Sequence, residues 1–180
     1  MTLQTLNIKG IQPARSAIKK HVLDNQITVL NQVMSENMNA DQTADDRIIN
    51  LEPFTAKETT IIPYWKGYNT PALGLLALPG TIVNDADNYY EFIYQMGVVV
   101  LTDGADATIL QLKVERYLEA LQRLLHEKAI PYDMGSKVAY VLCTEVDPSQ
   151  EILTAEKNNT ANHAFRKQGS ITIQIHIKEG

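Results

Sequence analysis

The chain has 180 residues and a mass of 20.1 kDa, a length that predicts one domain with a sizeable core. Apolar residues make up 44% and charged residues 21% of the sequence, which excludes a collagen, a coiled-coil rod and a chain disordered throughout. The net charge is -5 and both halves of the chain are acidic. Tight nonspecific binding of duplex DNA is therefore disfavoured, because it needs clustered lysines and arginines.

The sequence carries no sign of secretion or membrane insertion. Its first ten residues lack the basic and apolar regions of a signal peptide, and its apolar runs are far shorter than a membrane span. The single cysteine, Cys143, cannot form an internal disulfide. We therefore expect a soluble, cytosolic product that does not associate with membranes.

The first expected element is a helix that starts at Pro13 and fades near Glu36, after an N-terminal extension of residues 1–13. Apolar residues recur at intervals of three and four in two rows, whose combined width is typical of a substantially buried helix. The rows are Ile18, Val22, Val29, Val33 and Leu23, Ile27, Leu30, Met34. The polar and acidic residues 37–50 predict a loop.

Three strands are expected next, over residues 57–64, 71–78 and 89–102. The first is rich in Thr and Ile, and the second is apolar and ends at a Pro-Gly pair. The third becomes apolar on both faces at Val98–Leu101, which is typical of a strand in the middle of a sheet. Residues 84–88 have turn chemistry.

A second amphipathic helix is expected over residues 105–128, with Asp103 and Asp106 in a capping arrangement at its start. Strands are expected over 138–146 and 170–178, and the latter alternates isoleucines with polar residues in the clearest period-two pattern of the chain. The polar residues 149–169 between them predict a long loop.

The expected order is therefore α-β-β-β-α-β-β. The simplest arrangement is an α+β fold in one domain of residues 1–180, with a mainly antiparallel sheet of about five strands and both helices packed on one face. The polar loops at 37–50 and 149–169 are too long to be mere connectors. Two interpretations remain open for them, as contacts to a neighbouring subunit or as flexible loops.

No catalytic, cofactor or metal site is recognisable in the sequence. Phosphate-binding loops, dinucleotide fingerprints and paired-cysteine zinc spacings are all missing. Cys143 lies in an apolar strand, as a small buried residue would, and Asp85 with Asp87 favours a turn over a cation site. The histidines, expected to be structural or solvated, are His21, His126, His163 and His176. We expect a protein that is not an enzyme.

Aromatic residues gather in two segments, Tyr64–Tyr68 and Tyr89–Tyr94. They are typical either of a protein interface or of aromatic pairs across neighbouring strands, and the sequence leaves both open. Base stacking is disfavoured because the aromatics are not accompanied by a basic groove.

The order of the segments resembles the phage tail terminator family, also described as tail completion proteins. The resemblance covers about residues 14–178 and rests on loose patterns. They are the opening helix Ile18–Met34, the strand entry Pro71-Ala72-Leu73, the strand Tyr89–Leu101 that runs into Asp103, the helix 105–128 with Glu115-Arg116-Tyr117-Leu118, and the strands 138–147 and 170–178. Relative to a minimal member, residues 37–50 and 149–169 form longer connections.

The resemblance implies a structural virion protein that assembles as a ring, typically of six subunits. Such a ring caps the head-proximal end of the tail tube, ends tail polymerisation and offers a docking face to the neck. The implied partners are further copies of the chain, the tail tube protein, neck or connector proteins and sheath proteins. DNA would pass through the lumen without specific binding, helped by an acidic wall that repels phosphates. The family brings no catalytic residues and no cofactor.

Two other functions remain open at this point. The chain could instead be a neck or head-completion protein of the same virion class. It could also be a small-molecule-binding regulatory domain, because an α+β fold alone does not decide function.

Overall fold

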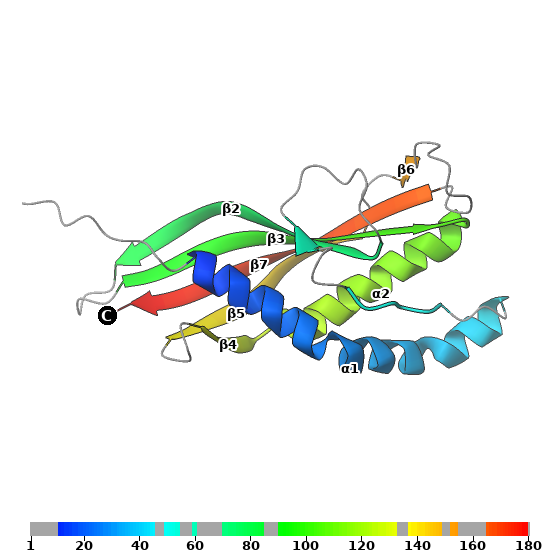
Figure 1. The fold of residues 1–180 in the computed structure, drawn as a ribbon, viewed down its shortest axis with the longest axis horizontal. Coiled ribbons are helices and arrows are strands. Elements are labelled where there is room, and N and C mark those ends of the chain that lie inside the picture. The colour runs from blue at the N-terminus through cyan, green and yellow to red at the C-terminus, as the bar shows by residue number, and fades with distance from the viewer. Residues whose placement is uncertain are drawn as a thin grey trace, which may run out of the picture.

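The computed structural model describes residues 11–45, 49–54, 59–60, 70–84, 90–132, 137–148, 152–154 and 165–179. Their elements, in chain order, are α1 (Ile11–Asp45), β1 (Thr59–Thr60), β2 (Ala72–Asn84), β3 (Tyr90–Gly104), α2 (Ala107–Leu125), β4 (Lys128–Tyr132), β5 (Lys137–Asp147), β6 (Ile152–Thr154) and β7 (Phe165–Glu179). Both helices lie on one face of a long twisted sheet (Figure 1).

The sheet has the strand order β1-β2-β3-β7-β5-β4, and β6 pairs with the start of β7. Only the short β1–β2 pair is parallel within the described residues, and the other pairs are antiparallel. The C-terminal strand β7 thus lies in the middle, between β3 and β5. The expected α+β fold, with a mainly antiparallel sheet and two helices on one face, is confirmed.

The core lies between the sheet and the helices. Ile171, Ile173, Ile175 and Ile177 of β7 are fully buried, which confirms the period-two pattern, since alternate residues of a strand point to the same face. The residues of β3 from Val98 to Leu101 are buried on both faces, as the sequence predicts. Val99 and Leu101 belong to a small second cluster with Ala72, apart from the main core.

Helix α2 packs closely against β7 at a glycine. A Cβ atom on Gly169 would lie 2.6 Å from Val114 Cγ1 and 2.8 Å from Leu118 Cδ1, so the missing side chain makes room for the helix. The helix begins at Asp106, whose carboxylate accepts hydrogen bonds from the backbone N–H groups of Thr108 and Ile109. Asp106 alone is therefore the N-cap residue.

The expectation that Asp103 takes part in the cap is wrong. Asp103 lies in β3, paired in register with Arg166 of β7, and its carboxylate accepts a hydrogen bond from the Thr70 hydroxyl. Strand β3 continues to Gly104, so the backbone of residue 103 is still extended and belongs to the strand. The helix therefore starts two residues later than the sequence predicts.

The loop expected at 37–50 is wrong for its first nine residues, because α1 continues to Asp45. Residues 37–45 contain neither proline nor glycine, so nothing in them stops a helix. Asn37 adds support by donating a hydrogen bond to the Val33 carbonyl. At the other end the helix begins at Ile11, so it includes the last residues of the extension expected at 1–13. Residues 46–48 lie outside the described part of the chain.

The segment Ile49–Phe54 returns along the helices and joins them. Gln26 of α1 holds the backbone of Phe54 at two points, because its amide accepts from the Phe54 N–H (2.6 Å) and donates to the Phe54 carbonyl (2.7 Å). On the α2 side, the Tyr117 hydroxyl donates to the Glu52 carbonyl (2.8 Å). Ile49 and Phe54 are buried, and the Phe54 ring lies 5.1 Å from that of Tyr117.

Strands β2 and β7 exceed their expected bounds by several residues. Strand β2 does not stop at residue 78 but reaches Asn84, because an irregularity in the register between Leu78 and Thr81 accommodates the Pro-Gly pair. Strand β7 begins at Phe165, so the last part of the loop expected at 149–169 is wrong. Residues 152–154 of that stretch form β6, while 149–151 and 155–164 lie outside the described residues.

Strand β4 has no counterpart among the sequence predictions, which extend the second helix to residue 128 and place a turn at Pro131. The helix ends at Leu125, and Glu127 reverses the chain with a φ of 55°. Pro131 then lies in β4, which is an edge strand where a residue without an N–H is tolerated. Of the strand expected at 57–64, the structure describes only Thr59–Thr60, as β1.

Candidate assembly surfaces

No group of three or more His, Cys, Asp or Glu side chains among the described residues could hold a metal ion. No described helix is long and apolar enough to cross a membrane. Asp85, Asp87, His163 and Tyr64–Tyr68 lie outside the described residues.

The three described histidines have separate places in the fold. His21 Nε2 lies 3.1 Å from the Leu124 carbonyl and so links α1 to α2. His126 Nδ1 accepts a hydrogen bond from the backbone N–H of Cys143 (3.2 Å) and so links the end of α2 to β5. His176 is half-buried on the sheet face away from the helices, between Ile93 and Tyr140 in register.

Cys143 lies in β5 and packs, half-buried, against the main core. Burial raises the pKa of its thiol to about 11, because desolvation disfavours the thiolate. The thiol is therefore protonated at neutral pH and is a poor nucleophile. The interpretation of Cys143 as a small packing residue agrees with this environment.

The aromatic segment of β3 contributes to the core. Phe92 is buried and stacks on Tyr94, with ring centroids 6.1 Å apart and planes 9° from parallel. The two residues are i and i+2 on the same strand, so both face the helices. This stack is not a cross-strand pair, which is one of the two interpretations that the sequence leaves open. Tyr89 and the side chain of Tyr90 are not described.

One exposed apolar surface runs along the outer side of α1. We call it the helix stripe; it consists of Ile27 and Met38. Ile27 is 60% and Met38 42% exposed, whereas Leu23 and Met34 are half-buried and pack against the main core. A spacing of eleven residues, about three turns, keeps Ile27 and Met38 on one side of the helix. The opposite side of α1, with Ile18 and Val22, packs into the core.

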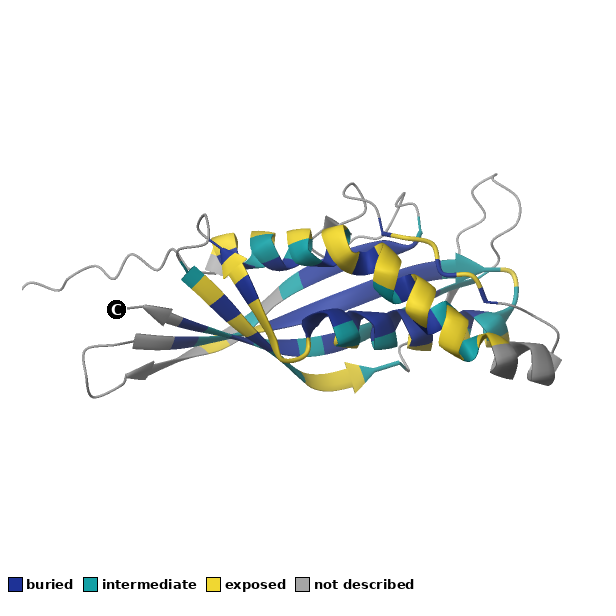
Figure 2. Cartoon of the chain, turned by 90° about the horizontal axis from the view of Figure 1, so that it is seen from below, coloured by how far each residue is buried: buried dark blue, intermediate teal, exposed yellow. Residues whose placement is uncertain are grey.

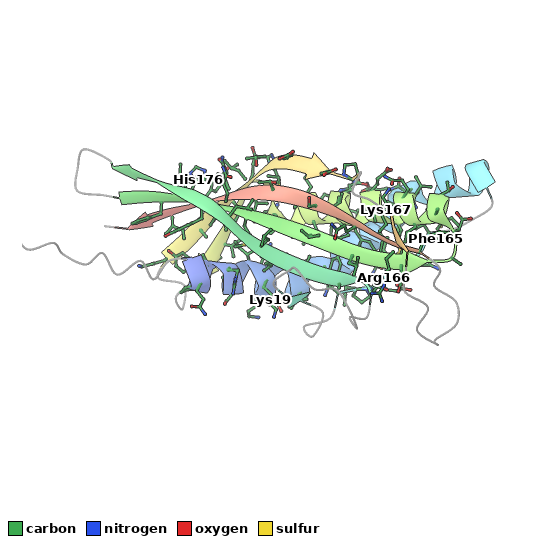
Figure 3. All side chains as sticks on the ribbon, turned by 90° about the horizontal axis from the view of Figure 1, so that it is seen from above. Lys19, Phe165, Arg166, Lys167 and His176 are labelled. Carbon is green, nitrogen blue, oxygen red and sulfur yellow. The ribbon has the colours of Figure 1, made fainter. Side chains whose placement is uncertain are left out.

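A second apolar surface lies on the sheet face away from the helices. We call it the sheet patch; it consists of Pro131, Val138, Tyr140 and Leu142. Val138 is 49% and Tyr140 41% exposed, and each alternates with the buried Ala139 and Val141. The alternation directs Val138 and Tyr140 away from the helix layer. Figure 2 looks onto the helix layer, and Figure 3 looks from the other side, onto the sheet with His176 labelled on β7.

Charged residues are distributed unequally along α1. Its lysines and its arginine are confined to the first third, at Arg15, Lys19 and Lys20, whereas its acidic residues are Asp24, Glu36, Asp41 and Asp45. This distribution opposes the helix dipole, which favours acids near the N-terminus and bases near the C-terminus. Two of these charges have partners within the chain, because Lys20 pairs with Asp24 and Glu36 pairs with Arg123.

The helix layer is held together by an ion-pair network. Arg123 of α2 contacts Glu36 of α1 at 2.6 Å and also its own helix neighbour Glu119. The hydrogen bonds from Arg123 hold the pKa of Glu36 below its usual value. The network links the second half of α1 to α2.

Sequence reasoning misses both surfaces. It predicts that both apolar rows of the first helix are buried. In the structure Ile27, which belongs to the row of Leu23, is exposed. The sequence does contain a signal for the sheet patch. Two apolar residues, Val138 and Tyr140, occupy the positions of β5 that alternate with its core residues. The stretch expected as a loop at 37–50 is mostly helix, and much of the loop expected at 149–169 lies outside the described residues, so a role of either stretch at subunit contacts stays a prediction.

The comparisons with known proteins give one distant structural neighbour to report. No family model matches the chain, and no curated protein matches it. Among solved structures, the chain is similar to a chain of a structure titled "Virion of native gene transfer agent (GTA) particle". The TM-score is 0.41 and the identity 10%, over 68% of this chain and 79% of that chain. A likeness at this level does not by itself identify what the chain does.

Proposed function

We propose that the chain is a structural virion protein that forms a ring of six subunits, as in the tail terminator family, at the head-proximal end of a phage tail tube. The ring ends tail polymerisation and provides the docking face for the neck. The sequence resemblance over residues 14–178 supports this proposal. The observed order of the long elements, with two helices on one face of a mainly antiparallel sheet, agrees with the fold that the resemblance implies.

The observation that carries the proposal is the pair of unlike apolar surfaces on opposite sides of the molecule. A closed ring of identical subunits needs two different patches, one of which meets the other on the next subunit. The helix stripe and the sheet patch are such a pair, with Ile27 and Val138 about half exposed or more. Exposed groups of large apolar side chains are typical of protein interaction sites.

The remaining parts of the proposal follow from the same role. The partners are further copies of the chain, the tail tube protein, and neck, connector or sheath proteins, and the protein is located in the virion. DNA passes through the ring without specific binding, in keeping with a net charge of -5. We propose that the protein acts without enzymatic activity or cofactor, as a part that other virion proteins bind.

The native mass of the protein tests the ring. We expect a species of about 120 kDa, six times the 20.1 kDa chain, in the presence of tail tube protein. A ring protein of this kind can remain monomeric until it meets the tail tube. The native mass is therefore measured with and without the tail tube protein. A species that remains a monomer or dimer under both conditions contradicts the ring and favours a regulatory domain.

A further inference from the structure

We propose that the sheet edge formed by β4 and the end of β5 is protected against strand addition, so that copies of this chain do not pair through it. We call it the protected edge; it consists of the positions whose backbone groups point outward: Ala129, Pro131, Cys143, Val146 and Pro148. The inference does not rest on the proposed function, because an open sheet edge is a hazard to any protein that is present in many copies. It adds that copies associate through surfaces other than this edge.

The protected edge runs along two strands in succession. Strand β4 is the last strand on its side of the sheet, and it pairs with β5 only as far as Val141, which lies opposite Lys128. From Leu142 to Asp147, β5 pairs with β7 on one side and has no neighbouring strand on the other side within the described residues. Residues 144–146 of this stretch are exposed (Figure 2).

On β4, a proline occupies one of the two outward positions. Opposite residues of antiparallel strands alternate between pairs that exchange hydrogen bonds and pairs whose backbone groups point away from each other. Pro131 has no N–H and lies opposite Val138, so this pair is one without hydrogen bonds. Pro131 and Ala129, two residues earlier, therefore direct their backbone groups away from β5. Of the two, only Ala129 has an N–H to offer.

On β5, the first outward N–H beyond β4 is capped by an imidazole. Ala139 and Val141 direct their backbone groups toward β4, and Cys143 continues this phase two residues beyond the last residue of the β4–β5 ladder. The backbone N–H of Cys143 donates to Nδ1 of His126 at 3.2 Å. His126 precedes the start of β4 by two residues, so its ring serves as the acceptor that a longer β4 would have supplied.

A bulge interrupts the edge directly after this cap. The register of β5 against β7 shifts between Cys143 and Glu145, which leaves Thr144 as the additional residue. The Thr144 hydroxyl donates a hydrogen bond to the Thr172 carbonyl of β7 at 3.2 Å. A bulge bends and twists its strand, and it is one of the devices by which sheet edges avoid pairing with another chain.

Val146 is the next outward position after the bulge. On β7, Thr172 follows Gln174 at the spacing of two residues that directs backbone groups to the same neighbouring strand, and Thr172 lies opposite Glu145. Glu145 thus bonds to β7, as does Asp147 two residues later. Val146 between them directs its N–H and its carbonyl away from β7.

Pro148 occupies the outward position that follows Val146. It has no N–H to offer, and its carbonyl accepts a hydrogen bond from Nε2 of Gln111 on α2 at 3.3 Å. Within the described part of this edge, only Ala129 and Val146 therefore keep an outward N–H without a partner, and the bulge and the imidazole cap lie between them. An added strand needs a regular series of donors and acceptors, which this edge does not present.

Hydrogen exchange of the full chain, followed by NMR, tests the imidazole cap. In the wild type we expect the Cys143 amide to exchange more slowly than the amides of Ala129 and Val146, because only the first has an acceptor. His126→Ala should accelerate exchange at Cys143, and His126→Asn, whose side-chain oxygen can accept a hydrogen bond, should accelerate it less. An unchanged exchange rate in His126→Ala would overturn the assignment of the cap.

An open-edge variant tests the edge as a whole. It removes three obstacles to pairing at once: Pro131→Val, Pro148→Val and His126→Ala. In the absence of tail tube protein, we expect it to sediment as a species of higher mass than the wild type. In that species the amides of Ala129 and Val146 should gain protection from exchange, because a strand of a second copy then pairs with them.

The matched control is Pro53→Val, at an exposed proline of the segment Ile49–Phe54 in the helix layer, and it should sediment like the wild type. An open-edge variant that sediments like the wild type overturns the proposal. So does one that associates without protection at Ala129 and Val146, since another surface then makes the contact. Thermal unfolding confirms that each variant is folded, and if the triple variant is not, Pro131→Val alone carries the comparison. Ring formation is measured separately with tail tube protein, so its failure leaves the protected edge standing.

Discussion

Replacement of Gly169 by alanine tests the close packing of α2 on β7. The added Cβ atom would lie 2.6 Å from Val114 Cγ1, 2.8 Å from Leu118 Cδ1 and 3.2 Å from the Asp147 carbonyl oxygen. Carbon atoms in ordinary contact are about 3.5–4.0 Å apart, so the helix must retreat by about 1 Å or two buried side chains must leave their rotamers. Such overpacking costs about 1–3 kcal/mol.

The measurement is the free energy of unfolding in denaturant, with Gly97→Ala as the matched control. Gly97 lies on the neighbouring strand β3, where an added Cβ would meet Leu76 Cβ at 3.7 Å, an ordinary contact. We expect Gly169→Ala to be less stable than Gly97→Ala by about 1–3 kcal/mol. Additional truncation of Val114 to alanine should cost less in the Gly169→Ala background than in the wild type. Equal stability of the two glycine variants would refute the reasoning.

Three further predictions concern the helix layer and the cysteine. Gln26→Leu should lower the free energy of unfolding by about 2–4 kcal/mol, because two buried backbone groups of Phe54 lose their partners; a loss below about 0.5 kcal/mol would count against the two-point contact. The pKa of Glu36 is lowered by Arg123, so its stabilisation is present above its usual pKa and is lost as the pH falls through the lowered value. The stability difference between wild type and Glu36→Gln should therefore vanish in acid, whereas a difference independent of pH would contradict the ion pair. Cys143, with a pKa raised from 9.0 to about 11, should be alkylated at pH 8 about 100-fold more slowly than in the unfolded chain, and equal rates would contradict its burial.

The sequence predicts those elements whose apolar pattern is decided by a single partner surface. Strand β7 alternates Ile171 to Ile177 against polar residues, because one face of it packs under the helices, and this pattern needs no knowledge of the rest of the fold. Helix α2 is equally clear, since one side of it faces the sheet. The order of these elements was sufficient to predict the α+β fold and its layering.

The differences between the predicted and the observed elements arise from tertiary structure. Helix α1 exceeds its expected end because its polar residues 37–45 lack a stop signal, and a polar helix end cannot be distinguished from a loop by apolar periodicity. Strand β4 is hidden by Pro131, which indicates a turn unless an edge position accommodates it. The broad apolar face of α1 is typical of a buried helix, but the sheet and α2 cover only one side of it, and Ile27 is left outside.

The helix stripe and the sheet patch cannot be recognised in the sequence for a similar reason. Apolar residues such as Val138 and Tyr140 look like core residues in the sequence, because nothing local tells which face of a sheet is covered. Only the register of β5 against its neighbours places them on the face away from the helices. The absence of a recognisable catalytic motif made the non-enzymatic expectation possible, and that expectation stays a prediction.

Electron microscopy of tail tubes assembled with and without the protein tests the central claim most directly. With the protein present, the account predicts tubes of limited length that carry additional ring-shaped density at one end. An Ile27→Asp variant should reduce the fraction of capped ends. The control is Leu112→Asp, at a 39% exposed position of α2 outside both apolar surfaces, which should leave this fraction unchanged. Tubes of the same length with unaltered ends, at protein concentrations that saturate the mixture, would contradict the account.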